Sequence, residues 1–557
     1  MYRLGRKTED DSRSSLIHGA AIMGLAAMAS KVLGTMQKIP LQNIAGDRVF
    51  GLYNAVYPFY QLLLVLATAG FPVAVSLLVA ERAACQDGRG ARQVLRVSLW
   101  LLVLTGAAVF AGMWFGADLA AGWIGDAAAA PAIRMSALAL WTMPAVAALR
   151  GYYQGLGRML PSAMSQLAEQ TLRVTAMLLL LMAGWQLGWP DERLAAGATA
   201  GSAVGGLAAL LMLAVIAMRE RRRARRTDSG SAAGGGEGTA VLVKRLAALA
   251  FPVALGALAV PMIAVVDALT VPRLLQSGGM DAAAAMTLFG QYSRGQPLVQ
   301  LVVMVAGAMA AAIVPALAAA RQRGDLRAAQ EQAALALRIA WCAGSASAIG
   351  VIVLAKSMNI MLYSDNEGIL VFMLIGSTAL AGTINAITAA LLPGLGAVRI
   401  PALLMLAAAA LKAALNAALV PACGIAGAAW AGIAALTAAA LLGAAAVRQA
   451  AAALGGAGGR SAASAPLRRS GGVVLALAVM AAALVLVERG FAPLLEQWLP
   501  QRAAATIIAL GGTALGAALF LAAAVRFGGV TARDLRELPG GTSIVRRLQR
   551  WRLLPRE

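Results

Sequence analysis

Positively charged side chains inside otherwise apolar stretches are the residues of this 557-residue sequence most suited to chemistry. A charge in a hydrophobic membrane span costs about 2.5–3.5 kcal/mol on insertion scales, so such residues face a cavity or a partner. Only two acids, Glu169 and Asp267, lie at the same depth. The interior is therefore net positive by four charges, which predicts a water-filled cavity that receives an anion. The six basic residues are Lys31, Lys38, Arg134, Arg173, Arg294 and Lys412.

The two lysines of the first apolar stretch lie seven residues apart, and we expect them on one face of a membrane helix. Lys38 is near the predicted outer end, where its ammonium can extend to the interface. Lys31 is about ten residues from either end and has no such route. The sequence therefore favours Lys31 as a ligand contact and leaves both interpretations open for Lys38.

The other charged residues also have ordinary structural interpretations. Glu169 and Arg173 are four residues apart, and we slightly favour an ion pair between them on one helix. Arg134 lies near a helix start, which favours an interfacial position. Asp267 is expected to pair with Arg273, to pair with a cavity lysine, or to bind a coupling cation.

Two cations belong to the second half of the chain. Arg294, beside a predicted break at Gly295 and Pro297, is the strongest ligand contact there. Lys412, with Asn416 one turn further on, either contacts the ligand or takes part in helix packing.

The sequence lacks the residues that enzymes and metal sites need. Its one histidine, His18, starts the first span and is expected at the interface. Cys85, Cys342 and Cys423 form no CxxC pair, so neither a zinc site nor a disulfide framework is indicated. No carboxylate pair at working spacing, nucleophile elbow or nucleotide loop occurs. The sequence therefore predicts a transport protein and not an enzyme.

The composition predicts the elements that position these residues. The chain is 60% hydrophobic and 13% charged, whereas a soluble domain is about 25% charged, so we predict an all-α polytopic membrane protein. A span needs about 20 apolar residues. The run 284–320 is too long for one straight span and should break near Gly295. The fourteen predicted spans are 16–39, 51–80, 94–116, 131–150, 161–185, 194–218, 243–270, 284–320, 332–355, 368–392, 400–420, 424–447, 471–488 and 503–526.

Lysine and arginine are distributed unevenly between the two sides of these spans. The N-terminus and the segments after even-numbered spans hold 35, and the segments after odd-numbered spans hold six. Positive loops stay in the cytoplasm, so both termini are predicted to be cytoplasmic. The net charge of +22 belongs to these loops and does not indicate nucleic-acid binding.

The two halves of the chain contain similar sequence motifs at nearly the same spacing. Gly-Leu-Gly at 155–157 recurs at 394–396, 239 residues later, each time before a helix that carries a cation. Pro72 and Pro315 lie 243 residues apart in similar settings. Such repeats are typical of secondary transporters, whose substrate site lies between the halves. We predict an N-terminal lobe (1–218), a basic and glycine-rich linker (219–240), a C-terminal lobe (241–450), two added spans (470–526) and a basic cytoplasmic tail (527–557).

Three stretches resemble a known family: SKVLGTMQKIPL with the residues that follow, RGYYQGLGRMLPSAMSQLAEQTLRV, and GLGAVRIPALLMLAAAALKAALN. They are similar to the stage V sporulation protein B branch of polysaccharide-exporting flippases, over roughly residues 15–450. The lipid II flippase and the multidrug and toxin extruders share that superfamily, the multidrug/oligosaccharidyl-lipid/polysaccharide exporters. The resemblance implies two pseudo-symmetric six-helix lobes in a V, two further helices that form a lipid-tail groove, and alternating access.

The resemblance also implies cavity residues. Lys31 in SKVLG and Arg294 in QYSRGQP match basic cavity positions of the lipid II flippase. The second cavity arginine of the first helix falls on Gln37, beside Lys38, and the acid before the eighth-helix arginine is replaced by Ser293. These departures leave open which lipid-linked glycan is the substrate.

The resemblance implies an undecaprenyl-diphosphate-linked oligosaccharide, such as lipid II, as the substrate. Together with the predicted cavity, it predicts a flippase that moves this substrate across the bacterial cytoplasmic membrane. We expect a monomer that contacts its lipid substrate and membrane lipids, with no metal and no cofactor except a coupling Na⁺ or H⁺. The alternatives are a cation-coupled multidrug antiporter, against which the cation surplus counts, and a non-transporting scaffold in envelope or spore assembly. The expected substrate contacts are Lys31, Lys38, Arg294, Arg173 and Lys412, and the expected ion-coupling residues are Asp267 and Glu169.

Overall fold

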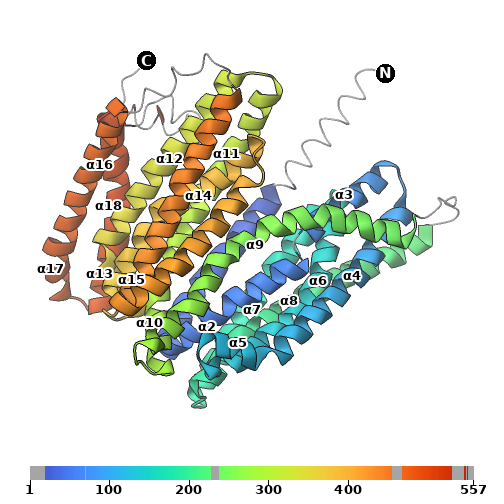
Figure 1. Cartoon of the computed structure of the whole chain (residues 1–557), viewed down its shortest axis with the longest axis horizontal. Helices are drawn as coiled ribbons and strands as arrows, with labels where there is room; N and C mark the ends of the chain where they lie inside the picture. Colours follow the sequence, from blue (N-terminus) through green and yellow to red (C-terminus); the bar gives the residue numbers. More distant parts are fainter. Residues whose placement is uncertain are drawn as a thin grey trace. The chain divides into compact units, whose positions relative to one another are not determined.

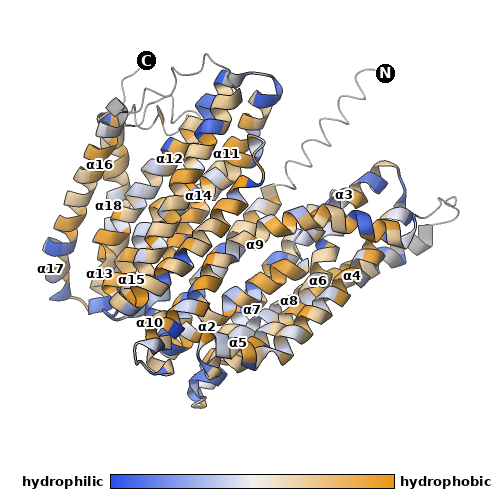
Figure 2. Ribbon diagram, viewed as in Figure 1, coloured by the Kyte–Doolittle hydropathy of each residue, from blue (hydrophilic) through white to orange (hydrophobic). Residues whose placement is uncertain are grey.

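Helices form every regular element within the residues that the computed structural model describes (Figure 1). Those residues are 19, 21–68, 70–227, 237–454, 467–529, 545–546 and 549. Twelve segments among them are long and apolar enough to cross a membrane, and apolar residues run along most of the helices (Figure 2). The all-α polytopic membrane class is confirmed. His18 and most of the basic tail lie outside the described residues.

The first compact unit, unit 1, comprises Met1–Gly290. Its most extensive contacts join α8 to α7 and to α6, and at the α6–α8 contact Val146 and Leu149 pack against Ala209 and Leu213. Ahead of the labelled elements, residues 21–36 are helical. The elements are α2 (Lys38–Thr68), α3 (Phe71–Ala84), α4 (Gly88–Phe115), α5 (Ala117–Ile124), the 3-10 turn η1 (Ala127–Ala129), α6 (Ala130–Gly155), α7 (Met159–Gln186), α8 (Asp191–Thr227), α9 (Thr239–Ser277) and most of α10 (Ala282–Ser293).

The second compact unit, unit 2, comprises Gln291–Glu557. Its core is a cluster of alanine, leucine and isoleucine side chains, such as Ile313, Ile387 and Val447, that joins α11, α12, α14 and α15. The elements are α11 (Gln296–Gln322), α12 (Leu326–Val353), α13 (Ala355–Tyr363), α14 (Ile369–Gly394), α15 (Ile400–Leu454), α16 (Leu467–Leu486), the π-helical η3 (Val487–Phe491), α17 (Ala492–Glu496) and α18 (Gln501–Arg526).

Within the described residues, the predicted spans are helical apart from short turns such as those at Gln37 and Gly70. The run 284–320 divides between α10 and α11, as its glycine and proline predicted. Two of the twelve membrane-length segments, Ala21–Ala84 and Ile400–Ala453, each contain two predicted spans, so the total of fourteen stays a prediction. Gly424, with φ 59° and ψ −143°, breaks the second of these segments between its two spans.

The first apolar stretch bends between its two lysines. Gln37 lies in a turn between two helical segments, because Pro40 has no N–H for the carbonyl of Met36 and its ring crowds that carbonyl. Lys31 is exposed and Lys38 is buried. The two lysines therefore lie in different surroundings, and their sharing of one helical face stays a prediction.

Ion pairs fix the start of α9 to the ends of α3 and α4. Arg82 binds the Glu237 carboxylate, and the Gln93 Nε2 donates to the Glu237 carbonyl at 2.6 Å. The Arg245 Nη2 donates to the Glu81 Oε2 at 2.9 Å. The start of α9, just after the basic linker, thus belongs to unit 1.

Unit 1 extends beyond the linker to Gly290 and includes α9, which packs on α2, α3 and α4. The boundary between the compact units in the sequence therefore falls within α10 and not in residues 219–240. The lobes 1–218 and 241–450, which we inferred from the sequence repeat, stay a prediction.

A further stretch of α2 recurs in α10 and α11 at the same offset of 239 residues as the Gly-Leu-Gly motifs. Seven residues are identical over eighteen positions, in the pattern F-G-x-Y-x4-P-x2-Q-L-x4-A. Arg173 and Lys412, the cations of the helices that follow the two Gly-Leu-Gly motifs, are separated by the same 239 residues. The identical pairs are Phe50 and Phe289, Gly51 and Gly290, Tyr53 and Tyr292, Pro58 and Pro297, Gln61 and Gln300, Leu62 and Leu301, and Ala67 and Ala306.

The two glycines of this motif lie at a close backbone contact between α2 and α10. A Cβ on Gly51 would overlap the carbonyl oxygen of Met286, and one on Gly290 would overlap that of Asp47. Only glycine permits this approach.

Candidate functional site

Lys38 and Arg173 form a buried positive cluster in unit 1. Lys38 begins α2 and is 5% exposed, so its ammonium does not extend to the surface. Arg173 lies within α7 and is 8% exposed. The two charges are close enough to repel each other. Neither forms an ion pair with a carboxylate within the described part of the chain.

Tyrosines of α2 hold the Arg173 guanidinium. Its Nη2 donates to the Tyr57 Oη at 3.0 Å, and its Cζ lies 5.2 Å from the centroid of that ring. Tyr53 stacks on Tyr57, with the two ring centroids 5.5 Å apart. The Gln37 Nε2 donates to the Tyr53 Oη at 3.1 Å. An aromatic face stabilises a desolvated cation by about 2 kcal/mol but carries no net charge. The cluster therefore remains cationic.

Unpartnered polar atoms surround the same cluster. The Gln170 Nε2, Gln37 Oε1 and Ser30 Oγ are buried without a hydrogen bond from the described residues. Gly34 lies against Gln170, because a Cβ there would come within 2.9 Å of the Gln170 Nε2. Buried polar atoms in native proteins normally have partners. The cluster thus offers positive charge and a free donor to an anion.

Glu169 does not neutralise Arg173. The Arg150 Nη2 of α6 donates to the Glu169 Oε2 at 2.8 Å, and the Arg150 Nε donates to the Ser165 Oγ at 2.9 Å. The predicted pair of Glu169 and Arg173 is therefore wrong, because an arginine of the neighbouring helix takes the carboxylate. Arg150 was overlooked since it ends the predicted span 131–150, whereas α6 continues for another turn. Ion coupling through Glu169 stays a prediction.

Two predicted cations lie nearer the surface. Arg134, near the start of α6, forms a 2.6 Å ion pair with Asp118 and is partly exposed, consistent with its interfacial interpretation. Lys31 is exposed on the helical residues 21–36. Its role as a ligand contact stays a prediction.

Lys412 of α15, the counterpart of Arg173 in the repeat, also contacts a tyrosine of its own unit, although Tyr292 corresponds to Tyr53 and not to the Tyr57 that Arg173 contacts. The Lys412 Nζ donates to the Tyr292 Oη at 3.1 Å and lies 5.8 Å from the centroid of that ring. Gly432 leaves room for the ammonium, because a Cβ there would lie 3.3 Å from the Lys412 Nζ. Lys412 and Asn416 are both buried. A cation held by a tyrosine thus occurs at equivalent positions of both repeats.

Arg294, which is 1% exposed, binds the turn that precedes α14. Both of its terminal nitrogens bind the Asp365 carboxylate, one of them at 2.9 Å. Its Cζ lies 5.3 Å from the Tyr363 ring centroid, and the Tyr363 Oη donates to the Arg294 carbonyl at 2.8 Å. An anionic ligand must therefore compete with Asp365 for this guanidinium. Substrate contact by Arg294 stays a prediction.

Asp267 is buried in α9, whereas Arg273 is exposed. Six residues turn an α-helix through about 600°, which places the two side chains on different faces. Arg273 joins no ion pair within the described residues, so the predicted alternative of an Asp267–Arg273 pair is excluded. The other two interpretations of Asp267 stay open.

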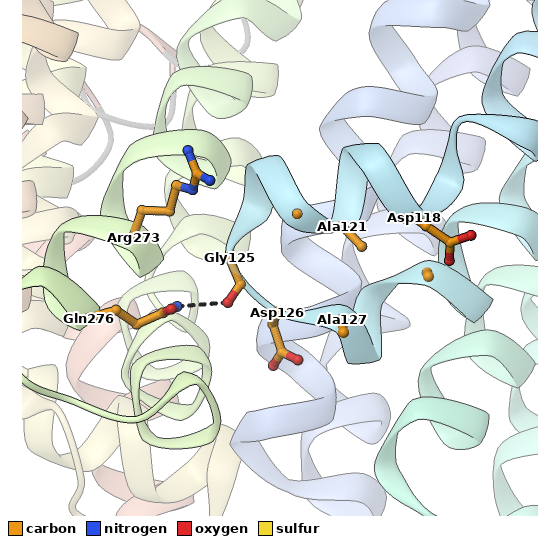
Figure 3. A pocket seen from close by; sticks show the side chains of 9 residues that line it. Asp118, Ala121, Gly125, Asp126, Ala127, Arg273 and Gln276 are labelled. Atoms are coloured by element: carbon orange, nitrogen blue, oxygen red, sulfur yellow. Dashed lines mark hydrogen bonds between the residues drawn. The ribbon is translucent and has the colours of Figure 1, made fainter.

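A pocket of about 390 Å³ lies in unit 1 where α5 meets the end of α9 (Figure 3). The Gln276 Nε2 donates to the Gly125 carbonyl at 2.9 Å and joins the two elements. None of the predicted substrate contacts lines this pocket. The lining residues are Asp118, Ala121, Gly122, Gly125, Asp126, Ala127, Ala130, Arg273 and Gln276.

The sequence interpretation missed the aromatic partners of the cations. Tyr57, Tyr292 and Tyr363 each contact one predicted cation. A signal was present, because Tyr53 and Tyr57 share a helical face and Tyr53 and Tyr292 occupy the same position of the repeated motif.

Comparison with known sequences gives one matching family. Residues 16–320 match the family described as polysaccharide biosynthesis protein. In Bacillus subtilis (strain 168), the uncharacterized membrane protein YabM is 32% identical over 549 residues, covering 97% of this chain and 99% of that protein. Stage V sporulation protein B is 24% identical, covering 64% and 68%. Lipid II flippase MurJ is 31% identical over 175 residues, only 30% of this chain and 32% of MurJ.

Solved structures share the fold. An inward-facing multidrug resistance MATE family transporter of the MOP superfamily superposes with a TM-score of 0.63 at 17% identity, covering 77% of this chain and 96% of that one. The lipid II flippase MurJ in an inward closed conformation gives 0.62 at 12% identity, covering 90% and 98%. Together with the sequence matches, these results confirm the resemblance inferred from the motifs.

Proposed function

Because this chain belongs to the polysaccharide biosynthesis protein family, we propose that it is a flippase for an undecaprenyl-diphosphate-linked oligosaccharide, with lipid II or a related envelope precursor as substrate. It carries the glycan headgroup from the inner to the outer leaflet of the cytoplasmic membrane by alternating access. The protein spans that membrane several times with both termini in the cytoplasm, and it makes and breaks no covalent bond in its substrate.

One observation supports this function above the others: Lys38 and Arg173 are both buried in unit 1, close enough for their charges to repel each other, and neither pairs with a carboxylate within the described residues. A buried charge left unpaired destabilises a protein by several kcal/mol. A cluster of two such charges is therefore suited to an anionic ligand with at least two charges. A diphosphate supplies this charge and accepts hydrogen bonds from guanidinium and ammonium groups.

The same arrangement explains how a diphosphate headgroup crosses an apolar layer. An ion moved unaccompanied into the hydrocarbon core has a prohibitive desolvation cost. Cations buried at membrane depth lower this cost while the polyprenyl tail stays in the lipid. Transport is coupled to the membrane potential or to a cation bound near Asp267, which is buried in α9.

The test uses full-length protein reconstituted in liposomes with a fluorescent undecaprenyl-diphosphate disaccharide. The assay measures how fast the label on the outer face becomes accessible to a membrane-impermeant quencher. We expect Arg173→Ala and Lys38→Ala each to slow transport at least about tenfold, the equivalent of 1.4 kcal/mol. Arg134→Ala is the matched control, because Arg134 is a partly exposed cation paired with Asp118, and it should transport normally.

The alternatives give different results in the same liposomes. A multidrug antiporter moves a cationic dye and leaves the lipid-linked disaccharide in place. A scaffold moves neither. If the wild-type protein does not move the disaccharide, or if both alanine variants move it at the wild-type rate, the proposed function is wrong.

A further inference from the structure

The same aspartate turn occurs twice, once in each repeat. The short helices α5 and α13 end at residues with left-handed backbones, Gly125 (φ 95°) and Ser364 (φ 67°), which lie 239 residues apart. An aspartate follows each of them, Asp126 and Asp365. Each aspartate Oδ1 accepts a backbone N–H from two residues further on, at 2.9 Å in both turns. The two turns are therefore copies of one structure.

The copies differ in what binds the second carboxylate oxygen. In unit 2, the Asp365 Oδ2 accepts the Arg294 guanidinium at 2.9 Å. The residue 239 positions before Arg294 is Ala55, on α2, and α2 contacts η1, which begins directly after Asp126. The Asp126 Oδ2 is buried and accepts no hydrogen bond from the described residues. Unit 1 therefore has the carboxylate of this turn but no matching cation among its described residues.

Among the described residues, no neighbouring basic side chain takes the place of the missing arginine. Asp126 is 6% exposed and lines the pocket between α5 and α9 (Figure 3). The Arg134 guanidinium at this end of the unit is paired with Asp118. Arg273 lines the pocket but points away from the Asp126 carboxylate in Figure 3. A buried carboxylate oxygen without a partner is costly, so a native protein normally satisfies it.

We propose that the Asp126 pocket binds a monovalent cation, which occupies the place that the Arg294 guanidinium has in the other repeat. One free carboxylate matches one positive charge. Sites for divalent cations use several acidic ligands, and no group of three or more potential metal-ligating side chains occurs within the described residues. The pocket volume of about 390 Å³ accommodates a hydrated alkali ion or a guanidinium ion. This site is separate from the Lys38–Arg173 cluster and does not depend on the proposed substrate.

The test measures the melting temperature of the full-length protein in lipid nanodiscs against increasing NaCl, KCl or guanidinium chloride at millimolar concentration. Choline chloride, whose cation is bulky, keeps the ionic strength constant. A ligand that binds only the folded state raises the melting temperature until its site is saturated. We expect a saturable rise with at least one of the three cations relative to choline. Comparing the three salts distinguishes an alkali-ion site from a site for organic cations.

Two matched variants locate the effect. Asp126→Asn removes the free charge and should abolish the rise. Asp118→Asn changes the other carboxylate of the pocket, which already has a basic partner. This variant should still show the rise in melting temperature. The proposal is overturned if no cation raises the melting temperature above choline, or if Asp126→Asn responds like the wild type. It is also overturned if Arg273→Gln gains a response that the wild type lacks, because Arg273 would then occupy the site.

A third variant introduces into unit 1 the arginine that unit 2 has at the equivalent position of the repeat. Ala55→Arg should supply the missing guanidinium, raise the melting temperature in choline and remove the response to added cation. Ala55 is fully buried, so this variant can fail to fold, and Asp126→Asn then decides alone.

Discussion

Buried cations in this protein are held by aromatic rings as well as by carboxylates. Arg173, Arg294 and Lys412 each lie over a tyrosine ring, with 5.2 to 5.8 Å to the centroid. Arg294 also binds a carboxylate through both of its terminal nitrogens. A tyrosine orients the charge without neutralising it, so Arg173 keeps more of its attraction for an anion.

This arrangement predicts that Tyr292 positions Lys412 for the diphosphate. Tyr292→Leu should weaken binding of a short-chain polyprenyl diphosphate about tenfold, which corresponds to a desolvated cation–π contact with its hydrogen bond. Tyr292→Phe keeps the ring and should lose about threefold. The measurement is a dissociation constant for the full-length protein in nanodiscs.

The control is Tyr60→Phe, since Tyr60 is equally buried and should bind normally. In a Lys412→Ala background, Tyr292→Leu should cause no further loss, because the tyrosine acts through the lysine. An equal loss in both backgrounds would show that Tyr292 only packs.

At the residue scale the sequence predicted the cations and not their partners. A lysine or arginine within an apolar run is conspicuous, so Lys38 and Arg173 could be recognised from the sequence alone. Glu169 illustrates the limit: its i+4 neighbour suggested an ion pair, and the fold brought Arg150 from another helix instead. The partners Tyr57 and Asp365 are 116 and 71 residues away from their cations, beyond any local pattern.

At the scale of helices, glycines set how closely the elements approach. Gly70 has a left-handed backbone (φ 79°) and faces the Ala250 carbonyl of α9, so it both breaks α2 from α3 and permits their contact with α9. Gly51 permits the contact of α2 with α10. These positions explain why long apolar helices pack closely in an alanine-rich chain.

Gly51→Ala should destabilise the protein, because its Cβ would overlap the Met286 carbonyl, and the backbone shift needed costs about 1–3 kcal/mol. Gly112→Ala is the matched control: no atom lies within 4 Å of its Cβ position in α4, and alanine is favoured by about 0.5–1 kcal/mol in a helix interior. Thermal unfolding of the two variants should therefore shift in opposite directions. A Gly51→Ala variant as stable as the wild type would contradict the close contact.

Helix positions were largely predictable, because apolar runs of span length must be helical in a membrane. The breaks near Gly295 and Gly70 were also predictable from glycine and proline. The short helices α5 and α13 were not, because eight and nine residues are too few to give a periodic signal. Their end turns carry the Asp126 and Asp365 carboxylates, so the missed elements include a candidate site.

At the scale of the whole molecule, each compact unit contains a buried cation on a tyrosine ring and an aspartate turn. The cations and the aspartates are offset by 239 residues, whereas the contacting tyrosines, Tyr57 and Tyr292, are not. The sequence indicated duplication through Gly-Leu-Gly and proline spacing, and the structure adds the correspondence of the Asp126 and Asp365 turns. The copies differ at the position of the repeat that Ala55 occupies in unit 1 and Arg294 occupies in unit 2.

The native cysteines test the predicted orientation. Cys85 follows the second predicted span and Cys423 follows the eleventh, so they are expected on opposite sides of the membrane; both are exposed, whereas Cys342 is buried. A membrane-impermeant maleimide should label Cys423 in intact cells and Cys85 only after permeabilisation. Cys85→Ala and Cys423→Ala identify each label. Labelling of both cysteines from outside would refute the predicted orientation.

The ion pairs at the start of α9 have a practical consequence. Glu237 and Arg245 fasten the chain to Arg82 and Glu81 directly after the linker. Hydrolysis of one peptide bond within residues 228–236 leaves these contacts, and the packing of α9 on α2, in place. The protein is therefore suited to expression as two separate polypeptides that find each other in the membrane, which would allow each fragment to be labelled on its own.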